Sequence, residues 1–555
     1  MQPVISAQQM REIDHLTVQN HKVSSLQLME SAAAACLQAV TTHFGGDLSG
    51  KKVQILCGPG NNGGDGAALA RQLASQQVQT DVILFGSISD TNGDARHNFA
   101  ALADLKLPRQ TLPLNFIECG DAKEWQQLAP DASVYDVIVD ALFGTGLKRA
   151  LGGVFADVVK YLEAIKTLQN NLASGPLIVS LDIPSGLDVD QAQPIGPTVG
   201  ADLTVTFTAP KIANVLPPAS HLNGKLVIAD IGSPTGLVDA AQSKLFLIEE
   251  KDAREFLVNT RYLPNSFKNT HGHVLVIAGS RGYTGAAALC GNAAMRAGAG
   301  LVTICTPVSS QSAVAAAAMP EVMTTALAET DRGSVSEDAV DHALALFEKA
   351  DVVAIGPGLS SSDERTRRFV YSVVGRRRTA LVIDADGLNC LSPWPADLQG
   401  SPTKQLILTP HPGEMLRLLG TREKSALDDR VAVAREFATQ HKLILVLKGS
   451  RSLVAAPDGR VFINPTGNAG LGTAGAGDTL TGIIAAFVAQ SVGILKEKAN
   501  PLEATIAALY VGGLAGDFAA KKLGMRTMVA SDIREHLGEA IRSLDQQGEQ
   551  PNFRQ

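Results

Sequence analysis

The chain contains repeated short runs of Val, Ile and Leu that end in glycine or an acidic residue and precede alanine-rich stretches. In the first half these runs are KKVQILCGPG, DVILFG, YDVIVDALFG, PLIVSLDIPSG and KLVIADIG. In the second half they are GHVLVIAG, LVTICTP, DVVAIGPG, LVIDADG, LILTPHPG and LILVLKG. Continuous apolar runs separated by helices are typical of strands buried on both faces of a parallel sheet. The sequence therefore predicts an α/β fold in both halves.

A chain of 555 residues is too long for a single hydrophobic core, so at least two large domains are expected. The apolar runs thin out between residues 225–232 and 272–279, and we place the boundary near residue 240. The predicted domains are residues 1–240 and 241–555. Each half has a strand, a glycine-rich turn and an alanine-rich helix, but nothing else in the halves aligns. We interpret this similarity as the need of any phosphate-binding turn before a helix for small residues, rather than as an internal repeat.

Composition excludes several classes of protein. The chain is 45% hydrophobic and 19% charged, which argues against disorder, and a net charge of −7 gives no basic footprint for nucleic acid. The six cysteines are scattered without the spacing of a zinc site, which favours a reducing cytoplasm and no structural metal. The N-terminus lacks the features of a signal peptide, and the apolar runs at 297–320 and 479–495 are interrupted by glycine or polar residues. We expect a soluble, cytoplasmic protein that does not enter a membrane.

The stretch NAGLGTAGAGDTLTG (468–482) concentrates glycine around one acid and then continues into the apolar run IIAAFVA. Glycine is entropically costly unless the backbone must bend or approach a ligand closely. Ala476 and Gly477 are expected to present backbone N–H groups at a helix N-terminus, which favours a bound anion. Asp478 would then lie beside that anion and take a proton from a hydroxyl during phosphoryl transfer. The alternative is a glycine-rich linker with a capping Asp478.

The first glycine-rich turn, GPGNNG, has Gly58, Gly60 and Gly63 in the spacing of a dinucleotide-binding motif. However, no acid ends the next strand, VILFG, where a ribose-binding carboxylate is expected. This disfavours a standard dehydrogenase, while a backbone site for phosphate remains expected. The chain also lacks a Walker motif, so a P-loop enzyme is not expected.

Oxygen-bearing side chains accumulate where neighbouring strands of the first half end. They are Asn61, Asn62, Asp65, Asp140, Asp182 and Ser185. Each one alone could simply cap a helix or turn. Several carboxylates in one crevice would repel one another, so either a bound cation or an acid with a raised pKa is expected. Carboxylate, amide and hydroxyl oxygens suit a hard cation.

These residues carry a resemblance to a known family. GPGNNGGDG (58–66), VDALFGTGL (139–147), LDIPSGLDVD (181–190) and TFTAPK (206–211) resemble NAD(P)H-hydrate epimerase domains, which have a Rossmann-like three-layer fold. Residues 268–302, with AIGPGL, LTPHPGEM, VLKGS and NPTGNAGLGTAGAGDTLTG, resemble ADP/ATP-dependent NAD(P)H-hydrate dehydratases, which have a ribokinase-like fold. The resemblance covers residues 1–540 and implies a fused, bifunctional nicotinamide nucleotide repair enzyme. The end of the chain, residues 539–555, reads as a polar tail.

For the first half, the resemblance implies Asp182 as the catalytic acid, base or iminium-stabilising carboxylate. It implies a potassium ion bound by Asn62, Asp140 and Ser185. The substrate-binding residues it implies are Asn61, Asn62, Gly63, Gly64, Asp65, Gly144, Thr145, Gly146, Leu147, Lys148, Arg149, Ala150 and Asp182.

For the second half, the resemblance implies Asp478 as the catalytic residue and Mg²⁺ bound together with ADP or ATP. The nucleotide-binding residues would be Lys448, Gly449, Ser450, Arg451, Ser452 and Gly477, and the hydrate-binding residues Ala286, Gly358, His411 and Asp478. From the residues alone, Lys448 could equally be a solvated lysine, and His411 a loop histidine held by the backbone.

The resemblance also implies the reaction. Hydrated NADH carries a hydroxyl on carbon 6 of its reduced ring, and phosphorylation would convert this poor leaving group into a good one. The expected partners are the small molecules NADHX, NADPHX, ADP and ATP, and a homo-oligomer is expected. Two alternatives stay open. The chain could be a ribokinase-like small-molecule kinase with a nucleotide-binding regulatory half, or its first half could be a binding module without catalytic activity.

Overall fold

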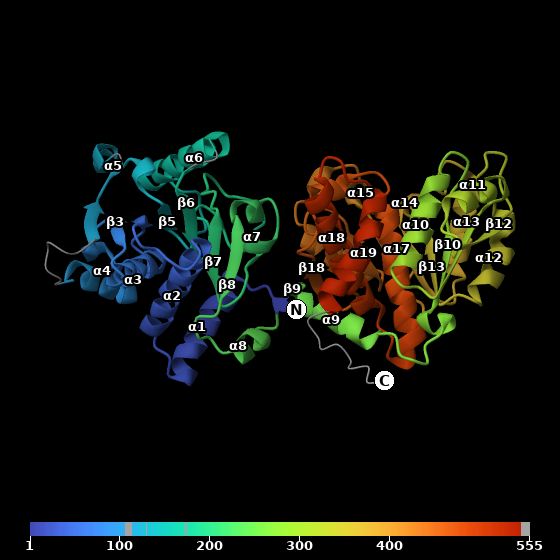
Figure 1. Ribbon diagram of the computed structural model, residues 1–555, viewed down its shortest axis with the longest axis horizontal. Coiled ribbons are helices and arrows are strands. Elements are labelled where there is room, and N and C mark those ends of the chain that lie inside the picture. Colours follow the sequence, from blue (N-terminus) through green and yellow to red (C-terminus); the bar gives the residue numbers. More distant parts are fainter. Residues whose placement is uncertain (106–113, 129, 173–174, 546–555) are drawn as a thin grey trace. The chain divides into compact units, whose positions relative to one another are not determined.

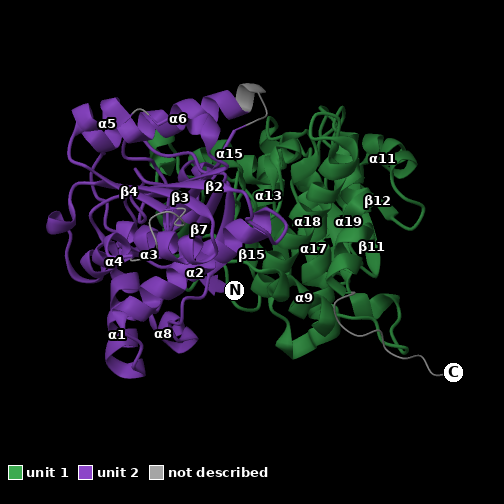
Figure 2. Cartoon of the chain, turned by 60° about the vertical axis from the view of Figure 1, so that its left-hand side comes forward, with its two compact units in different colours: residues 1, 244–555 green, residues 2–243 purple. Residues whose placement is uncertain are grey.

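The computed structural model describes residues 1–105, 114–128, 130–172 and 175–545. The chain divides into two compact units, residues 2–243 and residue 1 with residues 244–555 (Figure 2). The division lies three residues beyond the boundary expected near residue 240. Each unit contains its own sheet (Figure 1), and both units are α/β structures, as expected from the sequence.

The first unit is built on a seven-stranded sheet with the order β4-β3-β2-β5-β6-β7-β8, and all its neighbouring strands run parallel. The strands are β2 (Lys52–Cys57), β3 (Gln79–Phe85), β4 (Leu114–Cys119), β5 (Val137–Ala141), β6 (Leu177–Leu181), β7 (Leu203–Phe207) and β8 (Lys225–Ala229). The helices are α1 (Ala7–His21), α2 (Ser25–His43), α3 (Asn61–Ser75), α4 (Gly93–Ala103), α5 (Ala122–Leu128), α6 (Val154–Leu172), α7 (Ile212–Val215) and α8 (Thr235–Ala240), and the short β1 (Gln2–Pro3) precedes them.

Helices cover both faces of this sheet, because successive strand residues contribute to different cores. Ile55 of β2 belongs to a cluster with residues of α2, α3 and α4. The next residue, Leu56, belongs to a second cluster with residues of α5 and α6. Successive side chains of a strand point to opposite faces of the sheet. Because both faces are covered by apolar residues, every position of the strand is apolar, which explains the continuous runs in the sequence. The first unit is therefore a three-layer α/β structure.

Helix α1 begins at a capping box, in which Ser6 Oγ accepts a hydrogen bond from the Gln9 backbone N–H and Gln9 Oε1 accepts one from the Ser6 backbone N–H. Such a box satisfies two backbone N–H groups that the helix itself leaves unpaired. The Ala7 backbone also donates to Asp190 Oδ1 at 2.8 Å, which ties the start of α1 to the loop after β6. The position of α1 is thus fixed on the unit that it belongs to.

The second unit has a sheet that runs β9-β18-β17-β16-β15-β14-β13-β10-β11-β12. The strands are β9 (Leu245–Leu247), β10 (His273–Ile277), β11 (Leu301–Pro307), β12 (Met323–Leu327), β13 (Val352–Ile355), β14 (Ala380–Ile383), β15 (Leu406–Leu408), β16 (Ile444–Leu447), β17 (Leu453–Ala455) and β18 (Val461–Ile463). The helices are α9 (Glu250–Asn259), α10 (Thr284–Arg296), α11 (Gln311–Ala317), α12 (Val340–Phe347), α13 (Glu364–Gly375), α14 (Ala385–Cys390), α15 (Pro412–Leu418), α16 (Arg430–Gln440), α17 (Ala476–Gln490), α18 (Pro501–Leu523) and α19 (Ala530–Asp545).

This second sheet is mixed: the strands that the apolar runs predicted pair in parallel, and two short strands add antiparallel pairs. β17 pairs antiparallel with both β16 and β18, whereas the six strands from β15 to β12 in the sheet order are parallel. β17 and β18 are each three residues long, and short connections join β16 to β17 and β17 to β18. The three strands therefore form an antiparallel meander. The parallel part of the sheet carries the strand ends that the sequence singled out.

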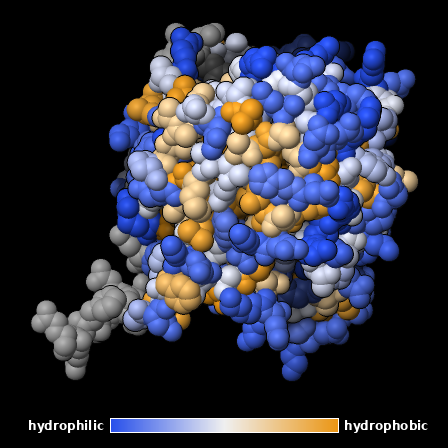
Figure 3. All heavy atoms as spheres, turned by 90° about the vertical axis from the view of Figure 1, so that its right-hand side faces the viewer, coloured by the Kyte–Doolittle hydropathy of each residue, from blue (hydrophilic) through white to orange (hydrophobic). Residues whose placement is uncertain are grey.

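Helices α17 and α18 form the centre of the second core. Together with its short continuation to Lys498, α17 is long and apolar enough to cross a membrane, and so is α18, but 72% and 67% of their apolar windows are buried inside the protein. On the face of the molecule in Figure 3, hydrophobic side chains are interspersed among hydrophilic ones. We therefore interpret both helices as core helices of the second unit.

The polar tail expected at residues 539–555 is partly wrong. Residues 539–545 belong to α19, where Ala540 and Leu544 are buried, so this part of the chain contributes to the core. The helix is amphipathic, and the polar residues that suggested a tail lie on its outer side. Residues 546–555 lie outside the described residues.

All six cysteines are buried free thiols.

Since each unit has its own sheet and its own apolar clusters, we expect fragments 1–243 and 244–555 to fold separately. Each purified fragment should be soluble, melt cooperatively and retain one of the two activities considered below. The measurements are thermal unfolding by circular dichroism and an assay of each fragment beside the intact chain. If both fragments aggregate or lack activity, the division into two independent domains is wrong.

Candidate active sites

The first unit contains a cavity of about 1230 Å³ beyond the carboxyl ends of β2, β5, β6 and β7. These four strands are neighbours in the sheet, and ligands of open α/β sheets bind at this edge. The glycine turn after β2 approaches the next loop closely. A Cβ atom on Gly58 would lie 2.0 Å from the carbonyl oxygen of Leu142, and one on Gly63 would lie 1.8 Å from that of Gly58. Close backbone packing therefore explains the glycines at both positions.

Most of the residues predicted for the first site line this cavity. They are Asn61, Asn62, Asp65, Gly144, Thr145, Gly146, Leu147, Lys148, Arg149 and Asp182. Gly63, Gly64 and Ala150 are not among the lining residues. Gly63 and Gly64 are buried at the start of α3, and a Cβ on Gly64 would lie 2.8 Å from the Cα of Ala95. The structure thus relates these two glycines to helix packing rather than to the cavity wall.

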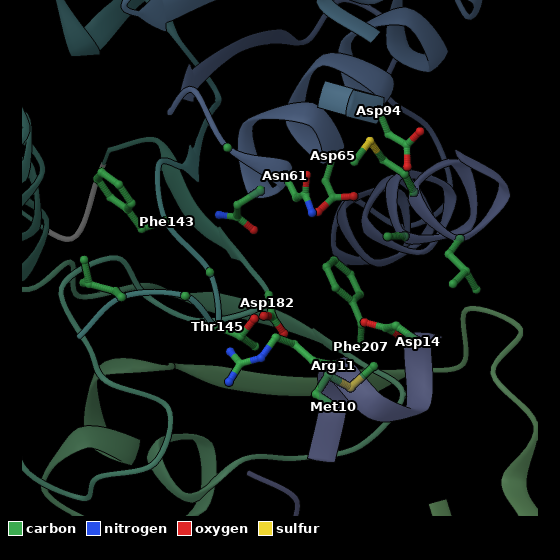
Figure 4. Close-up of a pocket in the computed structure, with 18 of the residues that line it drawn as sticks. Met10, Arg11, Asp14, Asn61, Asp65, Asp94, Phe143, Thr145, Asp182 and Phe207 are labelled. Atoms are coloured by element: carbon green, nitrogen blue, oxygen red, sulfur yellow. The ribbon is translucent and has the colours of Figure 1, made fainter. Parts of the chain in front are cut away.

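Asp182 directly follows β6 and forms a buried ion pair with Lys211, whose Nζ lies 2.7 Å from Asp182 Oδ1. The side chains are 9% and 1% exposed, respectively. Lys211 also donates to Thr206 Oγ1 at 2.8 Å and to the Phe207 carbonyl at 3.0 Å, so all three of its donors are used. Asp182 has a φ of 64°, a strained conformation for a residue other than glycine. The Asp182 carboxylate is therefore held in one position at the cavity (Figure 4).

Asp140 and Ser185 lie together below the cavity. Ser185 donates its hydroxyl to Asp140 Oδ1 at 2.6 Å and its backbone N–H to Oδ2 at 2.9 Å. Ser180 Oγ and the Leu142 N–H are the other donors to Asp140 in the described chain, and all of these donors are neutral. Burial raises the pKa of the Asp140 carboxyl. A buried carboxylate with only neutral partners is one that a cation would stabilise.

Asn62, the third predicted cation ligand, lies on α3 at the cavity wall, and its buried Nδ2 has no hydrogen-bond partner among the described residues. An amide, a carboxylate and a hydroxyl supply the oxygen ligands that a hard cation prefers. The residue types therefore fit a potassium ion.

The structure adds residues that the sequence interpretation did not assign to this site. Lys211 lay within the motif TFTAPK, so the sequence contained a signal for it. Asp14 comes from α1, far from any strand end, and no local pattern pointed to it. Burial raises the pKa of Asp14 to about 6, although Lys211 opposes this shift. Burial also raises the pKa of Asp65 well above its usual range, and the charges of Asp182 and Asp14 add to this effect.

In the second unit, three of the predicted residues follow parallel strands and a fourth lies at the start of a helix. Gly358 follows β13, His411 follows β15 and Lys448 follows β16, while Asp478 lies in the first turn of α17. Since β13, β14, β15 and β16 are neighbours in the sheet, their carboxyl ends meet at one edge. The sequence-predicted residues are thus placed on adjoining elements.

Lys448 is mostly buried and paired, which decides against the interpretation of a solvated lysine. Its Nζ lies 2.7 Å from Asp384 Oδ1 and 4.0 Å from Glu414 Oε2. Thr481 on α17 donates to the other oxygen of Asp384 at 2.8 Å. Burial would lower the pKa of Lys448, but the carboxylates of Asp384 and Glu414 outweigh this effect and raise it. The ammonium group is therefore charged and held in place.

Asp478 lies at the N-terminus of α17, after Gly475, whose φ of 85° lets the chain turn into the helix. A Cβ on Gly477 would lie 3.2 Å from Lys448 Nζ, so this backbone passes close to the ammonium group. Burial raises the pKa of Asp478 to about 7; the charge of Asp384 adds to this shift and Lys448 opposes it. A carboxylate with such a pKa is suited to act as a general base near neutral pH.

The residues predicted to bind the hydrate occupy defined positions. Gly358 and Ala286 are in contact, because a Cβ on Gly358, which has a φ of 63°, would lie 3.0 Å from the Ala286 Cβ. His411 is the N-cap of α15, where its Nδ1 accepts the backbone N–H groups of Gly413 and Glu414 at 3.0 and 3.3 Å. Its Nε2 then carries the proton and lies 3.4 Å from Glu414 Oε1. His411 is a capping residue, as its alternative interpretation held, and it is also half exposed beside Lys448.

The loop after Lys448 is held by its own contacts. Ser452 Oγ donates to the Gly449 carbonyl at 3.1 Å, Arg430 donates to the Ser450 carbonyl at 3.0 Å, and Arg451 donates to the Pro465 carbonyl at 2.6 Å. Gly449 has a φ of 146° and Arg451 a φ of 55°, so the backbone makes a sharp turn between β16 and β17. An ordered turn beside a buried lysine can present N–H groups to phosphate.

Asp384, Glu414 and Thr481 are the residues of the second site that the sequence interpretation missed. Asp384 directly follows the apolar residues of the run LVIDADG, so inspecting the acid at the end of every predicted strand would have found it. Glu414 lies in the motif LTPHPGEM. Thr481 gave no signal, because it lies one turn inside an apolar helix.

Comparisons with known proteins agree with the division into two units. A family model described as NAD(P)H-hydrate dehydratase matches residues 274–539, and one described as YjeF-related protein N-terminus matches residues 25–213. A bifunctional NAD(P)H-hydrate repair enzyme from Moorella thermoacetica is 38% identical over 98% of both chains. The enzyme of the same name from Escherichia coli is 33% identical over 86% of this chain and 83% of its own length.

A solved structure of an ADP/ATP-dependent NAD(P)H-hydrate dehydratase from Bacillus subtilis, co-crystallised with ATP and Mg²⁺, is also similar. It is 29% identical to this chain, covers 54% of this chain and 98% of its own, and superimposes with a TM-score of 0.45.

Proposed function

Because this chain belongs to the family of bifunctional NAD(P)H-hydrate repair enzymes, we propose that its two units carry out the two successive reactions of that repair. The first unit interconverts the R and S forms of hydrated NAD(P)H. The second unit dehydrates the S form to NAD(P)H at the expense of ADP or ATP, giving AMP or ADP and phosphate. The observation that carries the second assignment is Asp478, a half-buried carboxylate at a helix N-terminus beside the charged Lys448.

In the first unit, Asp182 is the catalytic carboxylate, held in place by its ion pair with Lys211. The first turn of α3 (Asn61–Asp65) and the loop Gly144–Ala150 bind the dinucleotide, mainly through those of their residues that line the cavity. The cavity of about 1230 Å³ suits a ligand of this size. Asn62, Asp140 and Ser185 would hold K⁺, which would supply the positive charge that the Asp140 carboxylate lacks. These roles rest on the contacts of each residue and on its match to the family motifs.

In the second unit, Asp478 accepts the proton of the hydroxyl on carbon 6 while the hydroxyl oxygen attacks the terminal phosphorus of the nucleotide. The P–O bond to the leaving nucleotide breaks, and AMP or ADP departs. The ring nitrogen then expels phosphate with the C–O electron pair, and loss of a proton from carbon 5 gives the NAD(P)H ring. Phosphoryl transfer is needed because hydroxide is a poor leaving group.

Lys448 and the loop Gly449–Ser452, with the Gly477 backbone, bind the nucleotide phosphates in this proposal. Mg²⁺ would neutralise phosphate charge, and Glu414 is the carboxylate that fits it, because it is buried and 4.0 Å from its nearest cation. Ala286, Gly358 and His411 bind the hydrate. ADP is the favoured donor, and cytoplasmic location and a homo-oligomeric state stay predictions.

The test is incubation of the protein with a mixture of both NADPHX epimers plus MgADP or MgATP. Recovery of the whole mixture as NADPH, measured by its absorbance, is the expected result, with equimolar AMP or ADP and phosphate. Accumulation of a stable phosphorylated product would favour a small-molecule kinase. Rapid recovery of only one epimer would mean that the first unit is a binding module.

The pH dependence of dehydration is a further expectation. Asp478 must be ionised to act as a base, and burial raises its pKa to about 7. The kcat/KM for MgADP reports the free enzyme, so it should rise about tenfold per pH unit below pH 7 and level off above it. Initial rates between pH 5.5 and 9 at fixed hydrate concentration measure this. A flat profile over this range would contradict the assignment of Asp478.

A further inference from the structure

We infer that Asp14 is a second catalytic residue of the first unit, which exchanges a proton with the ring nitrogen of the hydrate while Asp182 exchanges one with its hydroxyl. This inference rests on the proposed epimerase function. It is carried by the position of Asp14 in the cavity and by its buried Oδ1 atom, which has no hydrogen-bond partner in the part of the chain that the structure describes.

Asp14 lies on α1, one turn after Met10, and lines the same cavity as Asp182 and Asp65. In Figure 4 the three carboxylates come from three different elements and surround one space. The Oδ1 atom of Asp14 is buried and has no hydrogen-bond partner among the described residues. A buried carboxyl oxygen without a partner is costly in a protein that only needs to fold. A bound substrate would supply the missing partner.

Lys211 cannot compensate Asp14 directly, because its three N–H donors are already used by Asp182, Thr206 and the Phe207 carbonyl. The ammonium group thus pairs with Asp182, at 2.7 Å, and not with Asp14, whose pKa burial raises to about 6. Two carboxyl groups in one site with unequal environments are the arrangement that supports a base and an acid. The other titratable groups that line the cavity are Arg11, His15, Asp65, Asp90, Asp94, Lys148 and Arg149.

The chemistry of the hydrate requires two such groups. Carbon 6 carries both a hydroxyl and the ring nitrogen, so its configuration can be inverted by opening the ring. Asp182 takes the hydroxyl proton, the C–O bond becomes a carbonyl, and the bond between carbon 6 and nitrogen breaks. The electron pair goes to the nitrogen, which receives a proton from Asp14. Rotation of the aldehyde and closure on its other face reverse each transfer, so atoms, electrons and protons balance without a co-reactant.

The experiment compares epimerisation by the full-length protein with that of Asp14→Asn, Asp14→Glu and Glu12→Gln. Glu12 is an exposed residue of the same helix and does not line the cavity, so its variant controls for loss of charge on α1. Epimerisation of purified S-NADPHX is followed by chromatography without nucleotide, after subtraction of the spontaneous rate. Dehydration with MgADP is measured on each variant as an internal reference.

We expect Asp14→Asn to lower the epimerisation kcat by about 10²-fold or more, with Glu12→Gln and all dehydration rates unchanged. In the wild type, the kcat/KM of epimerisation should fall as the pH rises above about 6, because Asp14 loses its proton. This decrease, the basic limb of the pH profile, should be absent in Asp14→Asn. Asp14→Glu should restore the limb and part of the rate.

A rate for Asp14→Asn within about threefold of wild type, with the same pH profile, would overturn the role of Asp14. So would an Asp14→Glu variant that melts like wild type but is as inactive as Asp14→Asn. Absence of epimerisation in the wild type itself would overturn the proposed epimerase function, and the role of Asp14 with it.

Discussion

Asp478→Asn is expected to lower the dehydration rate by about 10²–10⁴-fold, the usual contribution of a general base. The substitution keeps the size of the side chain but removes the carboxylate that we propose accepts the hydroxyl proton. The N-terminus of α17 favours the negative charge of Asp478, which the variant loses. Asparagine is nevertheless common at helix starts, so the variant should still fold. Epimerisation should be unchanged, because it depends on the other unit.

The rates are measured as NADPH recovery from the S epimer with MgADP, beside nucleotide affinity by titration calorimetry. Asp331→Asn, at an exposed residue after β12, is the matched control for loss of one carboxylate in the same unit. Nucleotide binding by Asp478→Asn should stay within a few-fold of wild type, because Lys448 and the loop after it remain. A dehydration rate within a few-fold of wild type would remove Asp478 from the mechanism.

The sequence predicts the buried part of both sheets well, and the physical reason is burial on two faces. The runs VQILC and LIVSL became β2 and β6, whose residues alternate between two apolar clusters. The strand β4 was missed, because at the sheet edge it is only partly buried and its sequence, LNFIEC, is interrupted by the exposed polar residues Asn115 and Glu118. The three-residue strands β17 and β18 are too short to give a period at all.

The sequence predicts a site residue where that residue directly follows a recognisable buried strand. Asp182 and Lys448 end buried strands, so the rule that ligands bind at the carboxyl edge of a sheet finds them from the sequence. Their ionic partners are not predictable in this way. The pair of Lys448 and Asp384 joins residues 64 positions apart, and only the order of β14 and β16 in the sheet brings them together. Asp14 is harder still, because its helix precedes every strand of the sheet it packs on.

The structure changes what removal of the Asp182 charge should do. Asp182 is the only carboxylate bonded to the Lys211 ammonium in the described chain, and both groups are buried. Removing one partner of a buried ion pair typically costs about 3–5 kcal/mol. Asparagine still offers an oxygen to Lys211, so part of that cost should be avoided, and a lower melting temperature with a folded first unit is expected. Thermal unfolding must therefore accompany every rate measured on this variant.

Asp182→Asn is expected to block epimerisation selectively and so to split the recovery of a mixed NADPHX pool into two phases. With MgADP, the wild type should return nearly the whole pool to NADPH in one fast phase. The variant should convert the S epimer quickly, because its second unit is intact, and then slow to the spontaneous rate at which R becomes S. The loss of the base should lower the catalysed epimerisation rate by about 10²–10⁴-fold.

Asp230→Asn is the control for this experiment, because Asp230 also follows a strand of the same sheet, β8, but is exposed and outside the cavity. It should give a single fast phase like the wild type. If Asp182→Asn does so as well, the epimerase chemistry lies on other residues. If its slow phase equals the rate without protein while the variant melts cooperatively, the lost step is chemical, since the substrate loops and the fold remain. The ion pair with Lys211 then serves to position the Asp182 carboxylate for proton transfer as well as to stabilise the fold.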